Sequence, residues 1–414
     1  MINTIIHTLY WLFFSYCLFS VLYLFILAFF GRFFYREKVS SESQPIGYKR
    51  IAILVAAYKE DGIIISTAQH HLEQDYPREA YDIFVIADSF KPETILALRQ
   101  LPIQVLEVSF EKSTKLKSLD EAFKHIKGEY DVCLICDADN ILAEDALQRI
   151  NHYFWLGVKA VQGQRVAKNL DTPFAILDAC SEAVNNHIFR KGANAMGLSS
   201  PVIGSGMGFD FAMIRDIISE INALGGVIVH EDKILQLKVI EQGHKIHYIE
   251  SALIFDEKVD SPHAFEQQRK RWISGQFIYL KQFFFPAVKK LFTGNINYFY
   301  IAVTNNLILP RALLFVVFFI LVIVSFFFSK FLGLAAIGLC ALYFLTIMIS
   351  LPSGLINKDL GHAILRLPKA IRLMAGTLIG GKKANKTFIH TVHTRTEVTN
   401  TYVVKKTGKK NESI

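Results

Sequence analysis

Long apolar runs lie near both ends of this chain of 414 residues. The first, Tyr10–Phe30, is almost uninterrupted and is long enough to cross a hydrocarbon core of about 30 Å as a helix. Two more runs of similar length, Leu309–Phe328 and Phe331–Leu351, follow each other closely near the end. The pattern predicts an N-terminal membrane-spanning helix and a C-terminal hairpin of two such helices.

The region between these runs alternates between strand-like and helix-like patterns. Helix-like stretches include Ile63–Gln74 and Leu116–Lys127. Such alternation predicts an α/β domain with a mostly parallel, doubly wound sheet, in which ligands bind at the carboxyl ends of the strands. The strand-like runs are Arg50–Ala57, Tyr81–Ala87, Ile103–Val108 and Asp131–Cys136.

Charged residues near the apolar runs predict their orientation. Arg32, Arg36 and Lys38 follow the first run, whereas no Lys or Arg precedes it, so the positive-inside rule places its C-terminal side in the cytoplasm. The hairpin turn contains only Lys330, which places the turn outside. These features predict a multi-pass protein of the cell membrane with its α/β domain in the cytoplasm.

Two further stretches are apolar but contain several basic residues, which is typical of amphipathic helices in the membrane interface. They are Phe277–Tyr300 and Ile364–Leu378. The expected organisation is a spanning helix (1–31), a linker (32–48), a cytosolic domain (49–276), an interfacial region (277–308), the hairpin (309–352), a second interfacial helix (353–381) and a basic cytosolic tail (382–414).

Composition supports a mixed membrane and soluble chain, because 52% of the residues are hydrophobic and 20% are charged. The net charge of +8 comes largely from the tail, for which an anionic membrane surface is a better partner than nucleic acid. The five cysteines indicate no disulfide framework. Cys133 and Cys136 lie in a strand-like run, so buried thiols are expected instead of a redox or zinc pair.

Acidic residues follow two of the predicted strands. Asp137 and Asp139 come after the run that ends at Cys136, and Asp88 follows another run. Two carboxylates one residue apart at the end of a strand can hold Mg²⁺ or Mn²⁺ and bridge it to a diphosphate. Two solvated turn acids are the alternative, and the second strand-end acid favours the metal site.

Three other motifs contain candidate chemistry. Glu231-Asp232 precedes a helical pattern and can supply a general base, although acids also cap helices. Lys115 opens a helix near the predicted metal site, where it can help to neutralise a diphosphate or simply face solvent. Gly204-Ser205-Gly206 forms a flexible loop whose backbone can approach a ligand closely, and we expect it to contact the acceptor.

The last motif combines an amide, a guanidinium and an indole. Gln268 and Arg271 are three residues apart and share one face of a helix, where Arg can bind phosphate oxygens and Trp272 can stack on a sugar. We expect them to clamp the acceptor or the diphosphate. Arg269, Lys270 and Arg271 in a row can instead form a membrane-surface charge cluster.

In this order the motifs resemble those of membrane-bound family 2 glycosyltransferases, which include cellulose, hyaluronan and poly-N-acetylglucosamine synthases and ceramide glucosyltransferase. The resemblance implies a cytosolic GT-A domain. It assigns Asp232 as catalytic base beside Glu231, and Asp139 with Asp137 as metal ligands. It also assigns a nucleotide site that consists of Ala57, Tyr58, Glu60, Asp88, Lys115 and Asp137. Next to these residues, Lys59 stands where the family usually has Asn.

The tail sequence FIHTVHTR is similar to the W-x-x-T-x-R gating loop of several synthases, with Phe for Trp and His for Arg. Phe388, Thr391 and His393 are therefore expected to fold over the bound nucleotide. The alternative is a disordered basic tail attracted to lipid headgroups.

The implied function is inverting, metal-dependent sugar transfer from a nucleotide diphosphate donor, expected to be UDP-linked, to a growing polysaccharide. Polymer-secreting members commonly have more spanning helices than three, so transfer of a single sugar to a lipid is the alternative, and a non-catalytic binding subunit is a further one. The expected partners are the donor, a glycan or lipid acceptor, membrane lipids and either a second copy or export proteins, but no nucleic acid.

Overall fold

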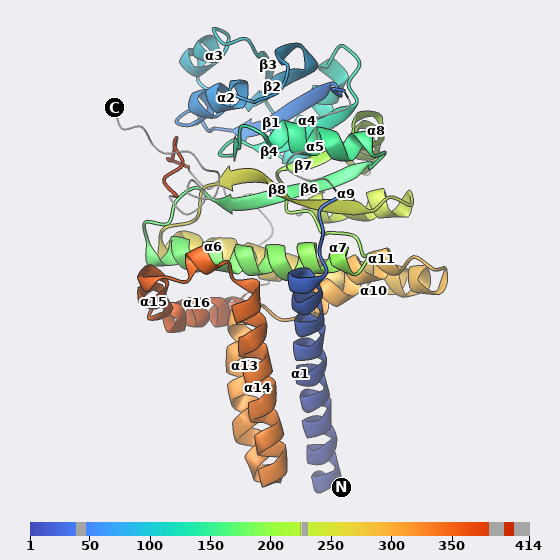
Figure 1. The fold of residues 1–414 in the computed structure, drawn as a ribbon, viewed down its shortest axis with the longest axis vertical. Helices are drawn as coiled ribbons and strands as arrows, with labels where there is room; N and C mark the ends of the chain where they lie inside the picture. The colour runs from blue at the N-terminus through green and yellow to red at the C-terminus, as the bar shows by residue number, and fades with distance from the viewer. Residues whose placement is uncertain (39–46, 224, 226–230, 381–392, 401–414) are drawn as a thin grey trace.

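The computed structural model describes residues 1–38, 47–223, 225, 231–380 and 393–400, the side chains of 375–380 excepted. Three levels are visible in Figure 1: a sheet with its helices, a layer of helices lying across the molecule, and a bundle of long helices that points away from the sheet. The arrangement places an α/β unit over a bundle of long helices.

The sheet has eight strands in the order β3-β2-β1-β4-β7-β6-β8-β5. The first four in this order are parallel to one another, β7 is antiparallel to both of its neighbours, and β6 and β8 are parallel. The predicted mostly parallel α/β sheet is therefore confirmed. The strands are β1 (Ile51–Tyr58), β2 (Tyr81–Asp88), β3 (Gln104–Val108), β4 (Val132–Asp137), β5 (Ile141–Leu142), β6 (Ala160–Ala167), β7 (Met207–Asp210) and β8 (Ile246–Asp256).

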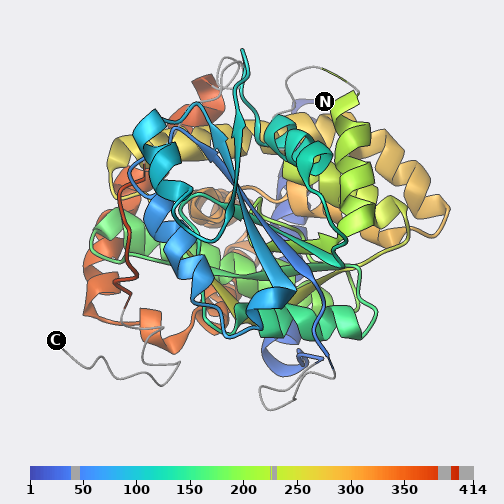
Figure 2. The same cartoon turned by 90° about the horizontal axis from the view of Figure 1, so that it is seen from above.

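Helices cover both faces of the sheet, as the view along the sheet in Figure 2 shows. Alternate residues of β1 enter different cores, with Ile53 packed in one cluster and Leu54 in the other. Burial on both faces explains why this strand is a continuous apolar run. The helices of this unit are α2 (Ile64–Leu72), η1 (Arg78–Ala80), α3 (Pro92–Leu98), α4 (Lys115–His125), α5 (Ala146–Trp155), α8 (Phe211–Ala223) and α9 (Glu231–Glu241).

The middle layer contains the helices that cross the molecule below the sheet (Figure 1). Its longest member, α10, starts after the N-cap Ser261 and runs through the position of the expected boundary at 276. The expected helix Ile364–Leu378 corresponds closely to α16, which begins at Leu367, and a separate short helix, α15, ends at Ile364. The layer comprises α6 (Pro173–Asn185), the π-helix η2 (Asn186–Gly192), α7 (Ala193–Ala195), α10 (Pro262–Phe292), α11 (Ile296–Phe299), η3 (Tyr300–Thr304), α12 (Asn305–Leu307), η4 (Ser353–Leu355), α15 (Lys358–Ile364) and α16 (Leu367–Gly380).

Three helices within the described residues are long and apolar enough to cross a membrane: α1 (Ile2–Phe33), α13 (Arg311–Phe328) and α14 (Lys330–Ser350). Near the start of α1, the Tyr10 hydroxyl donates to Ser325 Oγ at 3.0 Å, and its ring stacks on Phe328. At the other end, a Cβ on Gly192 of η2 would lie 2.2 Å from Leu27 O. Helix α1 therefore packs against the hairpin at one end and against the middle layer at the other.

Candidate active site

The carboxyl ends of the parallel strands bring the predicted acids to one edge of the sheet. Tyr58 at the end of β1 is in register with Asp88, and Ala56 is in register with Asp137. The residues directly after β1 and β2, Lys59 and Ser89, have left-handed backbone conformations with φ of 55° and 61°. Such conformations are uncommon for residues other than glycine and asparagine, and they turn the chain sharply where the strands end.

Asp88 presents an open acceptor at this edge. Its carboxylate is buried, and Oδ1 accepts a hydrogen bond from Ser89 Oγ at 2.8 Å. Its Oδ2 is also buried and has no hydrogen-bond partner among the residues that the structure describes. A buried acceptor without a partner is costly, so this oxygen is suited to an N–H or O–H donor of a ligand.

Asp139 lies deeper than Asp137. Its Oδ2 accepts from the Glu257 amide at 2.8 Å, and the side chain is buried. Burial alone would raise the pKa of this carboxyl, but the charges of His393 and Lys168 and the hydrogen bond from Glu257 hold it below the ordinary value. Asp139 is therefore a carboxylate anion in a buried place, which is the state that a metal ligand needs.

Lys115 joins Asp137 to the glycine loop. Its ammonium forms an ion pair with Asp137 and donates to Gly204 O at 2.7 Å. Burial acts to lower the pKa of Lys115, but the charges of Asp137 and Glu231 raise it overall. The lysine is therefore held as a cation between the predicted metal site and Glu231.

The residues at this edge fit a hard divalent cation in part. Asp137 and Asp139 offer carboxylate oxygens, the ligand type that Mg²⁺ and Mn²⁺ accept, and the cations Lys115 and Lys168 compensate their charge. Among the described residues, no group of three or more His, Cys, Asp and Glu side chains is arranged to hold a metal. A bound diphosphate would therefore have to supply further oxygen ligands.

Glu231 and Asp232 form the first turn of α9. Burial and the neighbouring charge of Asp232 raise the pKa of Glu231 to about 7. Gly204 has a φ of +87°, and a Cβ at this position would lie 4.0 Å from Asp232 Oδ2. The predicted acceptor loop and the predicted base are therefore neighbours, and the glycine leaves space beside the carboxylate.

The start of α9 is also tied to the segment that leads into the hairpin. Lys233 Nζ donates to Asn306 Oδ1 at 3.1 Å, and the Tyr279 hydroxyl donates to Lys233 O at 2.8 Å. Gln276 of α10 donates to Ile308 O at 2.7 Å. These contacts tie the start of α9 to α10 and to the segment that precedes α13.

Helix α10 presents the amide, guanidinium and indole motif. Gln268 Oε1 is buried and has no hydrogen-bond partner in the described part of the chain, whereas Arg271 and Trp272 are partly exposed. Arg269 points the other way, because it is buried, forms an ion pair with Asp178 of α6 and stacks on the Trp272 ring. The three adjacent basic residues therefore do not form a surface cluster, because Arg269 is buried.

Two residues that the sequence did not single out border Asp139. They are Lys168, at the end of β6, and Glu257, at the end of β8, and both contact the C-terminal segment 393–400. His393 in that segment donates from Nδ1 to Glu60 Oε1 at 2.8 Å. Phe388 and Thr391, from the same predicted loop, lie outside the described residues.

A buried network of four charges lies at the β6–β8 side of the site. Glu182 of α6 accepts from Arg165 Nε at 2.8 Å and forms an ion pair with Lys258, while Asp256 contacts the same two cations. Burial raises the pKa of Glu182, but the two cations lower it more. The network connects the strand ends that border Asp139 to helix α6 of the middle layer.

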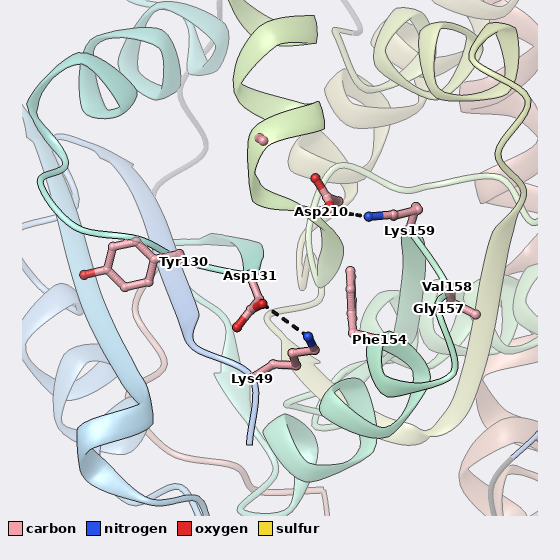
Figure 3. A pocket seen from close by; sticks show the side chains of 9 residues that line it. Lys49, Tyr130, Asp131, Phe154, Gly157, Val158, Lys159 and Asp210 are labelled. Atoms are coloured by element: carbon pink, nitrogen blue, oxygen red, sulfur yellow. Dashed lines mark hydrogen bonds and ion pairs between the residues drawn. The ribbon is translucent and has the colours of Figure 1, made fainter. Parts of the chain in front are cut away.

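A cavity of about 220 Å³ lies at the opposite edge of the sheet, where strands β1, β4 and β6 begin (Figure 3). Its charged side chains are paired with each other, Lys49 with Asp131 at 3.2 Å and Lys159 with Asp210 at 2.6 Å. None of the predicted site residues lines it. The converging acids at the carboxyl edge, and not this cavity, define the candidate active site.

The structure thus combines an α/β sheet that has acids at its carboxyl edge with three helices that are long and apolar enough to cross a membrane. A family model described as "Glycosyltransferase like family 2" matches residues 49–275. The chain belongs to this family.

Curated relatives are distant. The probable glycosyltransferase YdaM of Bacillus subtilis is 23% identical over 267 residues, which cover 61% of each chain. The beta-monoglucosyldiacylglycerol synthase of Synechocystis is 20% identical over 246 residues, which cover 58% of this chain and 50% of the relative. The matches thus span about half to three fifths of these relatives' lengths.

A solved structure has the same fold. The mannosyltransferase PcManGT of Pyrobaculum calidifontis, in complex with GDP-Man and Mn²⁺, has a TM-score of 0.52 and 17% identity, and the match covers 93% of this chain and 100% of that one. The predicted GT-A fold is therefore confirmed.

Proposed function

We propose that this glycosyltransferase moves a single sugar from a UDP-linked donor to a lipid acceptor at the membrane surface, with inversion at the anomeric carbon. The observation that carries the proposal is the position of Asp232. It lies beside the Gly204 loop, and the next residue, Lys233, is bonded to Tyr279 of α10 and to Asn306, which precedes α13. A lipid headgroup hydroxyl can reach a base at this level without leaving the membrane. The name of the Synechocystis relative, a beta-monoglucosyldiacylglycerol synthase, supports a lipid acceptor.

In this proposal the carboxyl ends of β1, β2 and β4 bind the donor. Asp88 Oδ2 accepts a hydrogen bond from the uracil or ribose, next to the backbone of Ala57 and Tyr58. Asp137 and Asp139 would hold Mg²⁺ or Mn²⁺, which would supply positive charge to the leaving diphosphate. Lys115 adds a second positive charge on the same side.

Asp232 acts as the base for the acceptor hydroxyl. It removes the hydroxyl proton as the oxygen bonds to the anomeric carbon, while the bond from that carbon to the diphosphate oxygen breaks on the opposite face. Such a displacement inverts the configuration. Gln268, Arg271 and Trp272 orient the acceptor and the leaving group, because the open Oε1 of Gln268 can accept from a sugar or headgroup hydroxyl.

We also propose that α1 crosses the cell membrane with its N-terminus outside, and that the α/β unit is cytoplasmic. The start of α1 and the α13–α14 turn lie at the far end of the bundle from the sheet (Figure 1). An impermeant thiol reagent applied to intact cells should label a cysteine introduced at Ser329 and not one introduced at Ser89. Labelling of Ser89→Cys alone would reverse the orientation.

The function is tested with purified protein in lipid vesicles, supplied with a panel of UDP-sugars and GDP-sugars. The expected product is a lipid with one added sugar, identified by mass spectrometry and dependent on Mg²⁺ or Mn²⁺. A ladder of water-soluble products would instead support the polysaccharide expected from the sequence. Nucleotide release without any glycosylated product would contradict both acceptors.

A further inference from the structure

The glycine loop that contains Ser205 is held against strand β6 by the side chain of Gln162. The Nε2 atom of this glutamine donates to Ser205 O at 2.9 Å, and its Oε1 accepts from the Ile203 amide at 3.1 Å. The amide of Gly163 donates to Gly206 O at 2.9 Å. Backbone and side chain of β6 therefore both fix the position of the loop beside the strand.

Two polar side-chain atoms at this junction are buried and have no hydrogen-bond partner among the residues that the structure describes. They are Ser205 Oγ and Gln164 Oε1. In the antiparallel pairing of β6 with β7, Gln162 is in register with Met207. Extending this register by two residues brings Gln164 opposite Ser205. The two open atoms therefore come from facing positions just beyond the end of the paired strands.

The backbone of β6 is irregular at the same point. Its register with β8 shifts between Gly163 and Gln164. Such irregularities re-aim the side chains beside them and are over-represented next to active sites. A buried polar atom without a partner costs free energy, and a ligand that forms a hydrogen bond with it offsets this cost. The open atoms of Gln164 and Ser205 are therefore suited to the polar groups of a ligand.

The loop also lies between the two chemical parts of the proposed reaction. Lys115 donates to Gly204 O and forms an ion pair with Asp137, so the loop borders the site proposed for the diphosphate. A Cβ on Gly204 would lie 4.0 Å from Asp232 Oδ2, so the loop also borders the proposed base. The sugar of the donor has to lie between its own diphosphate and the hydroxyl that the base activates. The loop therefore borders the place that this sugar would occupy.

We propose that Gln164 and Ser205 form a subsite that binds hydroxyl groups of the transferred hexose. The proposal rests on the proposed function, which supplies the diphosphate and the base between which the sugar lies. Gln164 Oε1 accepts a hydrogen bond, whereas the Ser205 hydroxyl can donate one and accept another. Sugar hydroxyls can both donate and accept, so they match this pair. The subsite assigns Ser205 to the donor, although the sequence pattern favoured the acceptor.

The test compares hexose nucleotides with analogues that lack one sugar hydroxyl, on the full chain in detergent with Mn²⁺. The probes are UDP-glucose and GDP-mannose, each with its monodeoxy analogues, and UDP and GDP without sugar. Titrations measure their affinities for the wild type, Gln164→Met and Ser205→Ala. Removal of at least one hydroxyl should weaken binding to the wild type by about three- to tenfold. In the variant that lacks the partner of this hydroxyl, the same removal should have little effect.

The affinity for UDP or GDP without sugar should be the same in both variants as in the wild type, which a merely structural role of the two residues would not produce. The matched control is Gln104→Met at an exposed position of β3, and it should keep the discrimination of the wild type. Equal affinity of the wild type for the parent nucleotide and for every deoxy analogue would overturn the proposal. An equal loss of affinity for nucleotides with and without sugar in the variants would also overturn it, because the loop itself would then be disturbed.

Failure of this inference is distinguishable from failure of the proposed function. Discrimination that is unchanged in both variants, in a protein that transfers sugar to lipid, would remove the subsite and leave the function intact. Discrimination that is lost in the variants, in a protein that transfers no sugar to lipid, would keep the subsite and remove the acceptor assignment. A protein that binds neither UDP-glucose nor GDP-mannose would contradict both.

Discussion

The two halves of the sheet position their polar residues by different means. In the half formed by β3, β2, β1 and β4, the buried apolar strands β2 and β4 end in acids, and their pairing on either side of β1 brings Asp88 and Asp137 to one edge. In the half formed by β7, β6 and β8, buried ion pairs and long-range hydrogen bonds fix the site. The comparison suggests that the first half binds the nucleotide and the second adapts the site to acceptor and membrane.

The largest effect is expected from removing the base in the second half. Asp232→Asn should lower the turnover number by about 10²–10⁴ because a positioned general base is lost. The affinity for the donor nucleotide should stay close to that of the wild type. Steady-state transfer rates and nucleotide titrations on the same preparation measure both quantities.

Asp210→Asn is a matched control, since Asp210 ends β7 at the opposite edge of the sheet and pairs with Lys159. Its turnover should be close to that of the wild type. If Asp232→Asn lost donor affinity while its turnover at saturation stayed high, Asp232 would be a binding residue.

The buried charge network should matter for stability. Glu182→Gln leaves Arg165 and Lys258 with a single carboxylate partner, Asp256, so it should cost about 3–5 kcal/mol. Chemical denaturation in detergent measures the change. The control is Glu107→Gln on β3, which breaks an exposed ion pair with Arg99 and should have a small effect on stability. Equal losses of stability in both variants would contradict a special role for the network.

A smaller effect concerns pH. The pKa of Glu231 is about 7 in the folded protein against an ordinary value of 4.5, so the folded state binds this proton more tightly. Stability should therefore fall as pH rises from about 4.5 to 7. Glu231→Gln cannot lose this proton, so its unfolding free energy relative to that of the wild type should rise by on the order of 1–3 kcal/mol between pH 5 and pH 8. Unfolding curves at both pH values test this, with Glu241→Gln as control on the same helix. Parallel pH profiles for the wild type and Glu231→Gln would refute the raised pKa.

Much of the first half could be predicted from the sequence. Strand-length apolar runs and their terminal acids are local patterns, so β1, β2 and β4 and the strand-end position of Asp88 and Asp137 follow from them. Local patterns do not show backbone conformation, and the left-handed φ of 55° at Lys59 became visible only in the structure. Asn tolerates this left-handed conformation, which explains why Asn suits this position in the family.

The second half depends on contacts between residues far apart in the chain. Lys168 and Glu257 belong to no local motif, and their place beside Asp139 arises from the pairing of β6 with β8 and from the return of the segment 393–400. Arg269 looked like part of a basic surface run because its partner, Asp178, lies 91 residues away. Such pairings are set by tertiary structure, so neither spacing nor composition reveals them.

The division of labour between the two halves is tested most directly by UDP binding with Mn²⁺ present, measured side by side for the wild type, Asp139→Asn and Asp232→Asn. We predict that Asp139→Asn weakens binding by about tenfold or more through loss of a metal ligand, while Asp232→Asn binds like the wild type. Wild-type affinity in Asp139→Asn, or an equal loss in both variants, would contradict the account.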